Sequence, residues 1–164
     1  MPDLYQGTEL WDHSLVDPDN RRPVDVDRIA AAIDAVACAG PVGTIGDLDD
    51  LADVGLDKLA LVVRALAVRA AHPASFAPGA GHEPLTASGS PHRSVVAYRR
   101  GDDVIAAVWL RPLDPCRGEL ALPPGEWDDE LVGPGGVPRR WSRTVPLGEA
   151  FDAAPVMLLT RAAR

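Results

Sequence analysis

Two stretches of the chain repeat apolar residues at the three- and four-residue spacing of an amphipathic helix. The first stretch predicts a helix over residues 25–39. Asp25 and Asp27 lie near its start, where a carboxylate caps free N–H groups and suits the helix dipole, and Gly40-Pro41 follows its end. The apolar stripe of this helix consists of Val26, Ile29, Ile33, Val36 and Ala37.

The second stretch predicts a helix over residues 57–71, which has the stronger periodicity of the two. Asp57 is the expected N-cap, and His72-Pro73 ends the helix because proline cannot continue it. One apolar stripe is expected on this helix, formed by Leu59, Val62, Val63, Leu66 and Ala70.

Helical periodicity stops near residue 76, and short runs rich in Val and Leu follow, separated by turn residues. Arg100-Gly-Asp-Asp103 between two such runs indicates a hairpin. The expected strands are Leu85–Ala87, Ser94–Arg100, Val104–Arg111, Glu119–Leu122, Trp127–Val132, Arg143–Leu147 and Pro155–Thr160. We therefore predict an α+β chain: helices in residues 1–75, then a small antiparallel β-sandwich in residues 76–164, with the boundary between 73 and 83.

The connections are marked by their composition. Residues 1–24 are expected to form a short strand at Leu4 and Tyr5, followed by a long loop that Pro18 and Pro23 keep from becoming helical. Residues 41–56 form a connection rich in Gly and Asp, with a turn of helix expected at Leu48–Val54.

Charge is spread unevenly along the chain, whose formal net charge is −8. Residues 1–57 hold 13 acidic and 3 basic side chains, whereas residues 58–164 hold 11 acidic and 13 basic ones. An acidic chain lacks the basic patch that phosphate binding requires, so nucleic acid is not an expected partner. No apolar run reaches the roughly 18 residues that cross a membrane, and no basic leader begins the chain, so we expect a cytoplasmic protein without membrane contact.

The cysteines and histidines follow no metal-binding pattern. Cys38 and Cys116 are 78 residues apart, outside any CxxC motif, and are expected to be free, buried thiols. The four histidines show neither HxxxH nor HExxH spacing, so no metal site is expected.

The first 25 residues carry the densest chemistry. They combine aromatic, carboxylate, amide and guanidinium groups, which are the groups that stack on sugar rings and hydrogen-bond sugar hydroxyls. Terminal residues tend to fray, so a loop loaded in this way predicts that further protein precedes Met1.

Specific motifs in these residues resemble those of a known protein family. Tyr5-Gln-Gly-Thr-Glu-Leu-Trp11 resembles the eighth strand, and the loop after it, of the barrel in the α-amylase clan of glycoside hydrolases. With Leu15-Val-Asp-Pro-Asp-Asn-Arg-Arg-Pro-Val-Asp25 it is most similar to the maltooligosyltrehalose synthase family. Weaker similarity extends over nearly the whole chain, through Lys58-Leu-Ala-Leu-Val-Val-Arg-Ala-Leu-Ala-Val-Arg69, His72-Pro73 with Phe76, Val95-Val-Ala-Tyr98, Leu122-Pro-Pro-Gly-Glu-Trp127 and Pro155-Val-Met-Leu-Leu159.

The resemblance implies both a fold and an activity. Residues 1–75 would be the last β/α unit of a (β/α)8 barrel, and residues 76–164 its trailing sandwich. The family converts the reducing-end α-1,4 bond of a maltooligosaccharide to an α,α-1,1 bond, an isomerisation in trehalose biosynthesis that needs no cofactor. The clan's catalytic carboxylates lie on barrel strands four, five and seven, which are not among these residues. We therefore expect no catalytic residue here and no activity from this chain alone.

The resemblance also implies substrate-binding residues, for which second roles stay open. Tyr5 would stack on a sugar or pack in the barrel, Glu9 would accept a sugar hydroxyl or fix a neighbouring loop, and Trp11 would be a stacking platform or a loop anchor. Asp19 is expected to pair with Arg21 or Arg22 and stiffen the loop, with direct sugar contact by at least one of the three. Trp109, Trp127 and Trp141 are expected in the core or on the sheet surface.

Three functions remain open. The first is the C-terminal part of a maltooligosyltrehalose synthase that acts on maltooligosaccharide. Its partner would be an upstream barrel segment or, through self-association, a second copy of the chain. The second function is a non-catalytic carbohydrate-binding or interaction module that uses the sandwich, and the third is a remnant without function.

Overall fold

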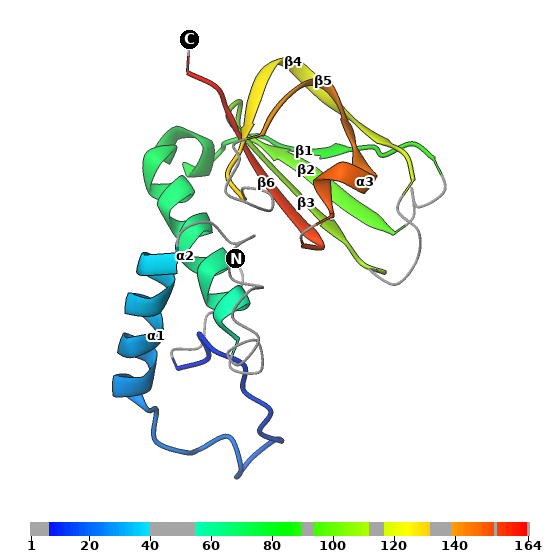
Figure 1. Ribbon diagram of the computed structural model, residues 1–164. Coiled ribbons are helices and arrows are strands. Elements are labelled where there is room, and N and C mark those ends of the chain that lie inside the picture. Colours follow the sequence, from blue (N-terminus) through cyan, green and yellow to red (C-terminus); the bar gives the residue numbers. More distant parts are fainter. Residues whose placement is uncertain are drawn as a thin grey trace.

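The computed structural model describes residues 7–39, 55–89, 94–111, 117–131, 139–152 and 154–163. Two long helices precede a sheet (Figure 1). The helical elements are α1 (Val26–Ala39), α2 (Leu56–Ala71), the short 3-10 helix η3 (Pro73–Phe76) and α3 (Leu147–Ala150). The strands are β1 (His82–Leu85), β2 (Val95–Arg100), β3 (Val104–Trp109), β4 (Glu119–Asp129), β5 (Arg140–Pro146) and β6 (Val156–Arg161).

The two long helices lie where the periodicity predicts them. Asp25 caps α1, because its side chain accepts the Arg28 N–H at 3.0 Å. The predicted Asp57 cap of α2 is wrong: the N-cap is Gly55, at φ 90°, with no side-chain cap. Asp57 lies in the first turn, where its charge suits the helix dipole. His72 closes the helix by donating its N–H to the Val68 carbonyl at 3.0 Å.

The buried faces of these helices differ from the predicted stripes. Helix α2 turns one row toward α1 and a second row toward the sheet, and it leaves most of the predicted stripe in solvent, with Leu66 54% exposed. The row facing α1 contains Leu56, Leu59 and Ala60, and the row facing the sheet contains Leu61, Ala65 and Val68. The small Ala60 and Ala32 sit between the helices, while Ile33 of the predicted α1 stripe is exposed.

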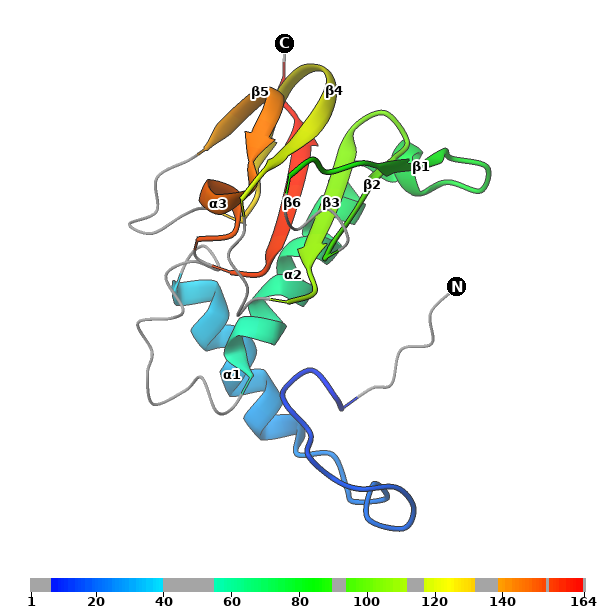
Figure 2. The same ribbon diagram turned by 90° about the vertical axis from the view of Figure 1, so that its right-hand side faces the viewer.

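All six strands belong to one antiparallel sheet of order β1-β2-β3-β6-β4-β5, so the predicted sandwich of two sheets is wrong. The sheet curls into a half-barrel, with β4 and β5 arching over the others (Figures 1 and 2). A bridge between Ala87 and Leu120 ties the segment after β1 to β4. Curvature lets one sheet enclose its own core.

Two predicted strands are a single strand in the structure. Glu119–Leu122 and Trp127 onward both lie in β4, whose register against β5 shifts between Ala121 and Glu126. Such a bulge bends a strand without ending it, which suits the arch of the sheet. The predicted hairpin at residues 100–103 is confirmed, with Gly101 at φ 55° between β2 and β3.

The concave side of the sheet holds the largest core, and the short helix α3 lies over it (Figure 2). Trp127, Ile105 and Leu159 are fully buried there. Trp109 and Trp141 pack against the same core and are partly buried. The prediction that the three tryptophans are core or sheet residues is therefore confirmed.

Helix α2 is joined to the outer face of the sheet. Val68 packs against Val104 and Leu158, and Arg64 forms an ion pair with Glu130. Near the end of α2, the Phe76 ring has the guanidinium carbon of Arg69 at 5.7 Å and that of Arg100 at 5.4 Å. Apolar packing, an ion pair and two cation–π contacts together hold α2 against the sheet.

Some of the predictions concern residues that the structure does not describe. The predicted strand at Leu4 and Tyr5, the helical turn at 48–54 and Cys116 lie outside them. Cys38 is free but exposed, so its predicted burial is wrong: it lies on the outer side of α1. Within the part of the chain that the structure describes, no helix has the length and apolar character to cross a membrane.

Candidate functional site

A pocket of about 1210 Å³ lies where the loop of residues 7–25 meets the starts of α1 and α2. Its walls combine one exposed aromatic ring with carboxylate, amide, imidazole and guanidinium groups. The residues lining it are Gly7, Thr8, Leu10, Trp11, Asp12, His13, Ser14, Leu15, Val16, Asn20, Arg22, Pro23, Val24, Asp25, Arg28, Ile29 and Lys58. The loop that the sequence marks as chemically dense therefore does enclose a pocket.

Trp11 lies in the pocket wall with its side chain 47% exposed. The Lys58 Nζ atom, from the first turn of α2, lies 5.2 Å from the centroid of the Trp11 ring. The same ammonium group donates to the Leu10 carbonyl at 3.1 Å and to the Thr8 carbonyl. A half-exposed ring held in this way can stack on an apolar or sugar face.

Asp19 connects two parts of the loop, at Leu15 and at Arg22. Its carboxylate accepts the Leu15 N–H at 2.8 Å and lies 3.8 Å from the Arg22 guanidinium, while Arg22 Nε donates to the Asp19 carbonyl at 3.1 Å. Of the two pairings expected for Asp19, the structure forms the one with Arg22. Arg21 pairs instead with Asp17, and of the two arginines only Arg22 lines the pocket.

Asp12 shapes the rim. Ser14 donates both its backbone N–H, at 2.8 Å, and its hydroxyl, at 2.6 Å, to the Asp12 carboxylate. The hydroxyl hydrogen bond is the main reason why the pKa of Asp12 lies below its usual value, because such bonds favour the charged form. Asp12 is therefore a charged acceptor at the rim.

Of the predicted site residues that the structure describes, Trp11 and Arg22 line the pocket, whereas Glu9, Asp19 and Arg21 do not. Glu9 does not line the pocket, and its buried Oε2 atom has no hydrogen-bond partner among the described residues. A buried carboxylate oxygen normally has a donor, so both roles expected for Glu9, contact with a sugar hydroxyl and contact with a neighbouring loop, stay predictions. Tyr5 lies outside the described residues.

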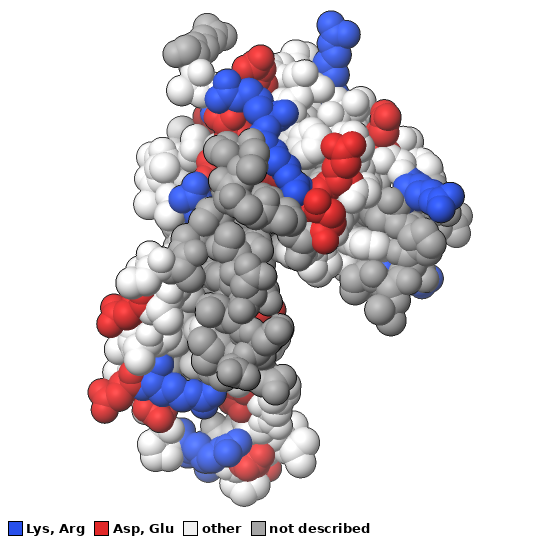
Figure 3. All heavy atoms as spheres, in the orientation of Figure 1, with Lys and Arg blue, Asp and Glu red and all other residues white. Residues whose placement is uncertain are grey.

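The charges around the pocket alternate in sign. Figure 3 shows acidic and basic side chains close together over the lower part of the molecule, where the loop and α1 lie. The pocket carboxylates Asp12 and Asp25 are exposed, and each accepts a nearby N–H group. Glycoside hydrolysis needs a pair of carboxyls, one of them protonated at neutral pH through burial. Asp12 and Asp25 are both exposed, so neither has the burial that this requirement names.

Lys58 is one of several polar pocket residues to which the sequence analysis gave no site role; the others include Asp12, His13, Ser14, Asn20 and Arg28. Lys58 was part of a helix pattern and carried no role of its own. The composition could have singled out Lys58, since it is the only lysine among 16 basic residues. Lysine presents a compact charge with three donors, whereas arginine presents a planar fork.

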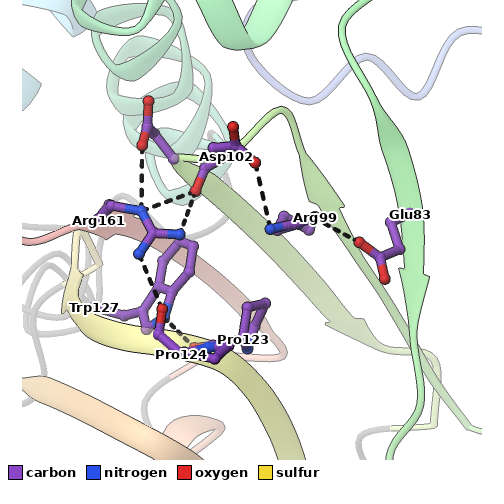
Figure 4. Close-up of polar contacts among 8 residues, drawn as sticks. Glu83, Arg99, Asp102, Pro123, Pro124, Trp127 and Arg161 are labelled. Carbon is purple, nitrogen blue, oxygen red and sulfur yellow. Dashed lines mark hydrogen bonds and ion pairs between the residues drawn. The ribbon is translucent and has the colours of Figure 1, made fainter.

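A second polar cluster lies at the other end of the molecule (Figure 4). Arg161, on β6, donates to the Asp102 carbonyl at 3.0 and 2.8 Å and to the Pro124 carbonyl at 3.0 Å. Its guanidinium carbon lies 4.7 Å from the centroid of the Trp127 ring. These groups bind one another, so the cluster joins the β2–β3 turn to β4 and β6 and is structural.

One carboxyl outside the pocket has a strongly perturbed pKa. Burial of Asp129 at the end of β4 raises its pKa from 3.8 to about 6, because desolvation penalises the charged form. The Leu131 N–H, which donates to it at 3.0 Å, opposes this shift, as do Trp141 and Arg139. Asp129 is 7% exposed and faces the protein interior, so it is a determinant of stability.

Comparison with known proteins agrees with the motifs of the loop. No family model matches the chain. Two strains of Mycobacterium tuberculosis have proteins assigned as maltooligosyl trehalose synthases that are 40% identical to it over 166 residues, covering 98% of this chain and 19% of each relative.

Solved structures give the same result. The maltooligosyltrehalose synthase from Arthrobacter ramosus has a TM-score of 0.78 and 31% identity, over 98% of this chain and 20% of that one. A second maltooligosyl trehalose synthase, at 22% identity and a TM-score of 0.69, shares the fold. This chain spans about a fifth of the length of these relatives, and in sequence and fold it corresponds to a C-terminal segment of the maltooligosyltrehalose synthases.

Proposed function

We propose that these residues are the part of a maltooligosyltrehalose synthase that closes one side of its substrate site. The observation that carries the proposal is the pocket. The loop with the family's motif folds over a hollow of about 1210 Å³ that is lined by an exposed Trp11, by Arg22 and by hydrogen-bonding groups of both signs. Aromatic faces and directional polar groups are what a sugar site requires.

The reaction proposed for the whole enzyme is an intramolecular transglucosylation. A carboxylate attacks the anomeric carbon of the penultimate glucose and displaces the reducing-end glucose, which a carboxylic acid protonates. The released glucose then attacks the same carbon of the glycosyl-enzyme through its own anomeric hydroxyl. The α,α-1,1 bond forms as the enzyme carboxylate leaves, and the conjugate base of the acid takes the hydroxyl proton. The clan's three catalytic carboxylates are this nucleophile, this acid and a third that stabilises the transition state, and we expect them on barrel strands four, five and seven, outside these 164 residues. We expect Trp11, Asp19, Arg21 and Arg22 to hold sugar or stiffen the loop, and Tyr5 and Glu9 to have the roles that the resemblance implies.

The proposed fold of the intact enzyme places residues 1–75 as the last β/α unit of a (β/α)8 barrel and residues 76–164 as its trailing domain. The exposed face of α2 supports this placement. Val62, Val63 and Leu66 are 38%, 40% and 54% exposed, and in the barrel they would pack on a neighbouring element. The partner of this chain is therefore the rest of the barrel, and the enzyme is a cytoplasmic isomerase.

Calorimetric titration of the 164-residue chain with maltopentaose tests the binding role. We expect weak binding that Trp11→Leu abolishes, because the stacking face is lost. Tyr98→Leu is the matched control, since that ring stacks on His82 at 4.6 Å, away from the pocket. Equal binding of cellopentaose, or none of maltopentaose, would contradict the proposal.

Incubation with maltohexaose tests the assignment of the chemistry. The chain alone should release neither glucose nor products with a trehalose end, because it holds no catalytic carboxylate pair of the family. Activity from the isolated chain, lost on Glu9→Gln or Asp19→Asn, would show that catalytic groups lie in it. Glucan binding without any effect on mutase activity when the chain joins the rest of the barrel would favour the second candidate, a non-catalytic carbohydrate-binding module.

A further inference from the structure

The first turn of α2 holds the pocket segment Thr8–Trp11 from one side. Lys58 is half-buried there, and its ammonium group donates to the carbonyls of Thr8 and Leu10. An ammonium group has three donors, so two of them bind the backbone on either side of Glu9. The chain direction at Trp11 therefore depends on one side chain from a different element.

The same ammonium group also faces the Trp11 ring, 5.2 Å from its centroid. A cation at this distance is attracted to the face of an indole, and the attraction favours one ring orientation. Lys58 thus contacts both the backbone that leads to Trp11 and the ring itself.

Gly55 supplies an independent constraint, at the Cδ1 and Cγ atoms of the Trp11 ring. It has a φ of 90°, and a Cβ atom there would lie 2.5 Å from the backbone nitrogen of Trp11 and 2.7 Å from the Cδ1 atom of its indole ring. The indole therefore packs directly against the backbone at the start of α2, in space that only glycine leaves open.

We propose that Lys58 is a positioning residue that, with Gly55 behind the ring, orients Trp11 as a fixed wall of the pocket. Helix α2 is itself fixed to the sheet through Arg64 with Glu130 and through the packing of Val68. The orientation of Trp11 is thereby set by contacts with α2, which is fixed to the sheet, as well as by its own loop. The consequence for sugar binding rests on the proposed function, whereas the geometry does not.

The geometry can be measured directly because Lys58 is the only lysine of the chain. Incorporation of isotope-labelled lysine gives one set of side-chain NMR signals. We expect its Hε protons upfield of those of free lysine, owing to the ring current of Trp11. This shift should vanish in Trp11→Leu and persist in Trp109→Phe. Unshifted Hε protons in the wild-type chain would overturn the proposal without any variant being needed.

Substitution tests the effect on the ring. With 5-fluorotryptophan incorporated, the fluorine signal of Trp11 should move and broaden in Lys58→Met, which keeps the length of the stem but lacks the donors. Lys58→Arg should restore it in part, and Arg69→Met, which removes a charge from the far end of α2, should leave it unchanged. A Trp11 signal that Lys58→Met does not alter would overturn the proposal.

The affinity for maltopentaose separates this inference from the proposed function. If the wild-type chain binds the sugar, Lys58→Met should weaken binding about tenfold, Lys58→Arg should recover most of it, and Arg69→Met should not change it. Unchanged affinity in Lys58→Met would contradict the positioning role. If the wild-type chain binds no sugar, the proposed function fails, and the NMR signals alone decide whether Lys58 orients Trp11.

Discussion

The guanidinium carbon of Arg161 lies 4.7 Å from the centroid of the fully buried Trp127 ring, and its nitrogens bind the carbonyls of Asp102 and Pro124. One side chain at the end of β6 thus joins β6 and β4 to the β2–β3 turn (Figure 4). Gly125, at φ 129°, leaves room for it, because a Cβ atom there would lie 2.5 Å from Arg161 Nη1.

Arg161→Lys should lower the free energy of unfolding by about 1–3 kcal/mol. The charge remains, but Arg161 binds the two carbonyls through three separate nitrogens of one plane, and the single compact nitrogen of lysine cannot reproduce that geometry over the ring. Urea unfolding followed by circular dichroism measures the change. The exposed Arg117→Lys is the control, and an equal loss of stability in both variants would contradict a specific role for Arg161.

Gly55→Ala should destabilise the chain by about 1–3 kcal/mol, because it combines a positive φ with a Cβ atom that overlaps Trp11. The matched control is Gly79→Ala, at φ 85°, where a Cβ atom meets nothing within 4 Å. The difference between the two variants, measured by urea unfolding, isolates the contact with Trp11. No difference would mean that the indole is not held against α2.

Asp129 should make stability depend on pH. Its folded pKa of about 6 lies above the ordinary value of 3.8, so between these values the folded state keeps a proton that the unfolded chain has released. The resulting stabilisation is fully present below pH 3.8 and is lost as the pH rises through about 6. Across this window the loss is on the order of 2–3 kcal/mol.

Asp129→Asn should remove this loss, because an amide carries no charge and its oxygen still accepts the Leu131 N–H. Free energies of unfolding at pH 4.5 and 7 test the expectation, with the exposed Asp34→Asn as the control. A slope with pH that is unchanged in Asp129→Asn would show that Asp129 does not titrate in this range.

The double variant Val62→Asp with Leu66→Asp should leave the free energy of unfolding within about 1 kcal/mol, since both side chains are exposed. It should nevertheless abolish association with a co-expressed barrel segment, because that face would become charged. Sedimentation velocity reports the association. Val26→Asp, an exposed apolar position on α1, is the control, and association that survives the double variant would place the interface elsewhere.

Local signals in the sequence predicted the two long helices and the β2–β3 hairpin, but not the short helices η3 and α3 or the continuity of β4. The capping carboxylate at Asp25 and the break at His72-Pro73 mark real helix ends, and the residues at 100–103 form the predicted turn, because capping and turn geometry depend on neighbours along the chain. The chemistry of the loop was also readable, since Trp11 and Arg22 do line a pocket.

The tertiary structure alone decided how these elements combine. Periodicity marks an apolar face but not its partners, so the burial of Ala60 and Val68 in place of Val62 and Leu66 depends on α1 and the sheet. A strand pattern does not say to which sheet a strand belongs. The bulge in β4 bends this strand without ending it, so the described strands form a single curved sheet in place of two. The contact of Lys58 with Trp11 joins residues 47 positions apart, and no local rule of sequence encodes a contact made by packing across such a separation.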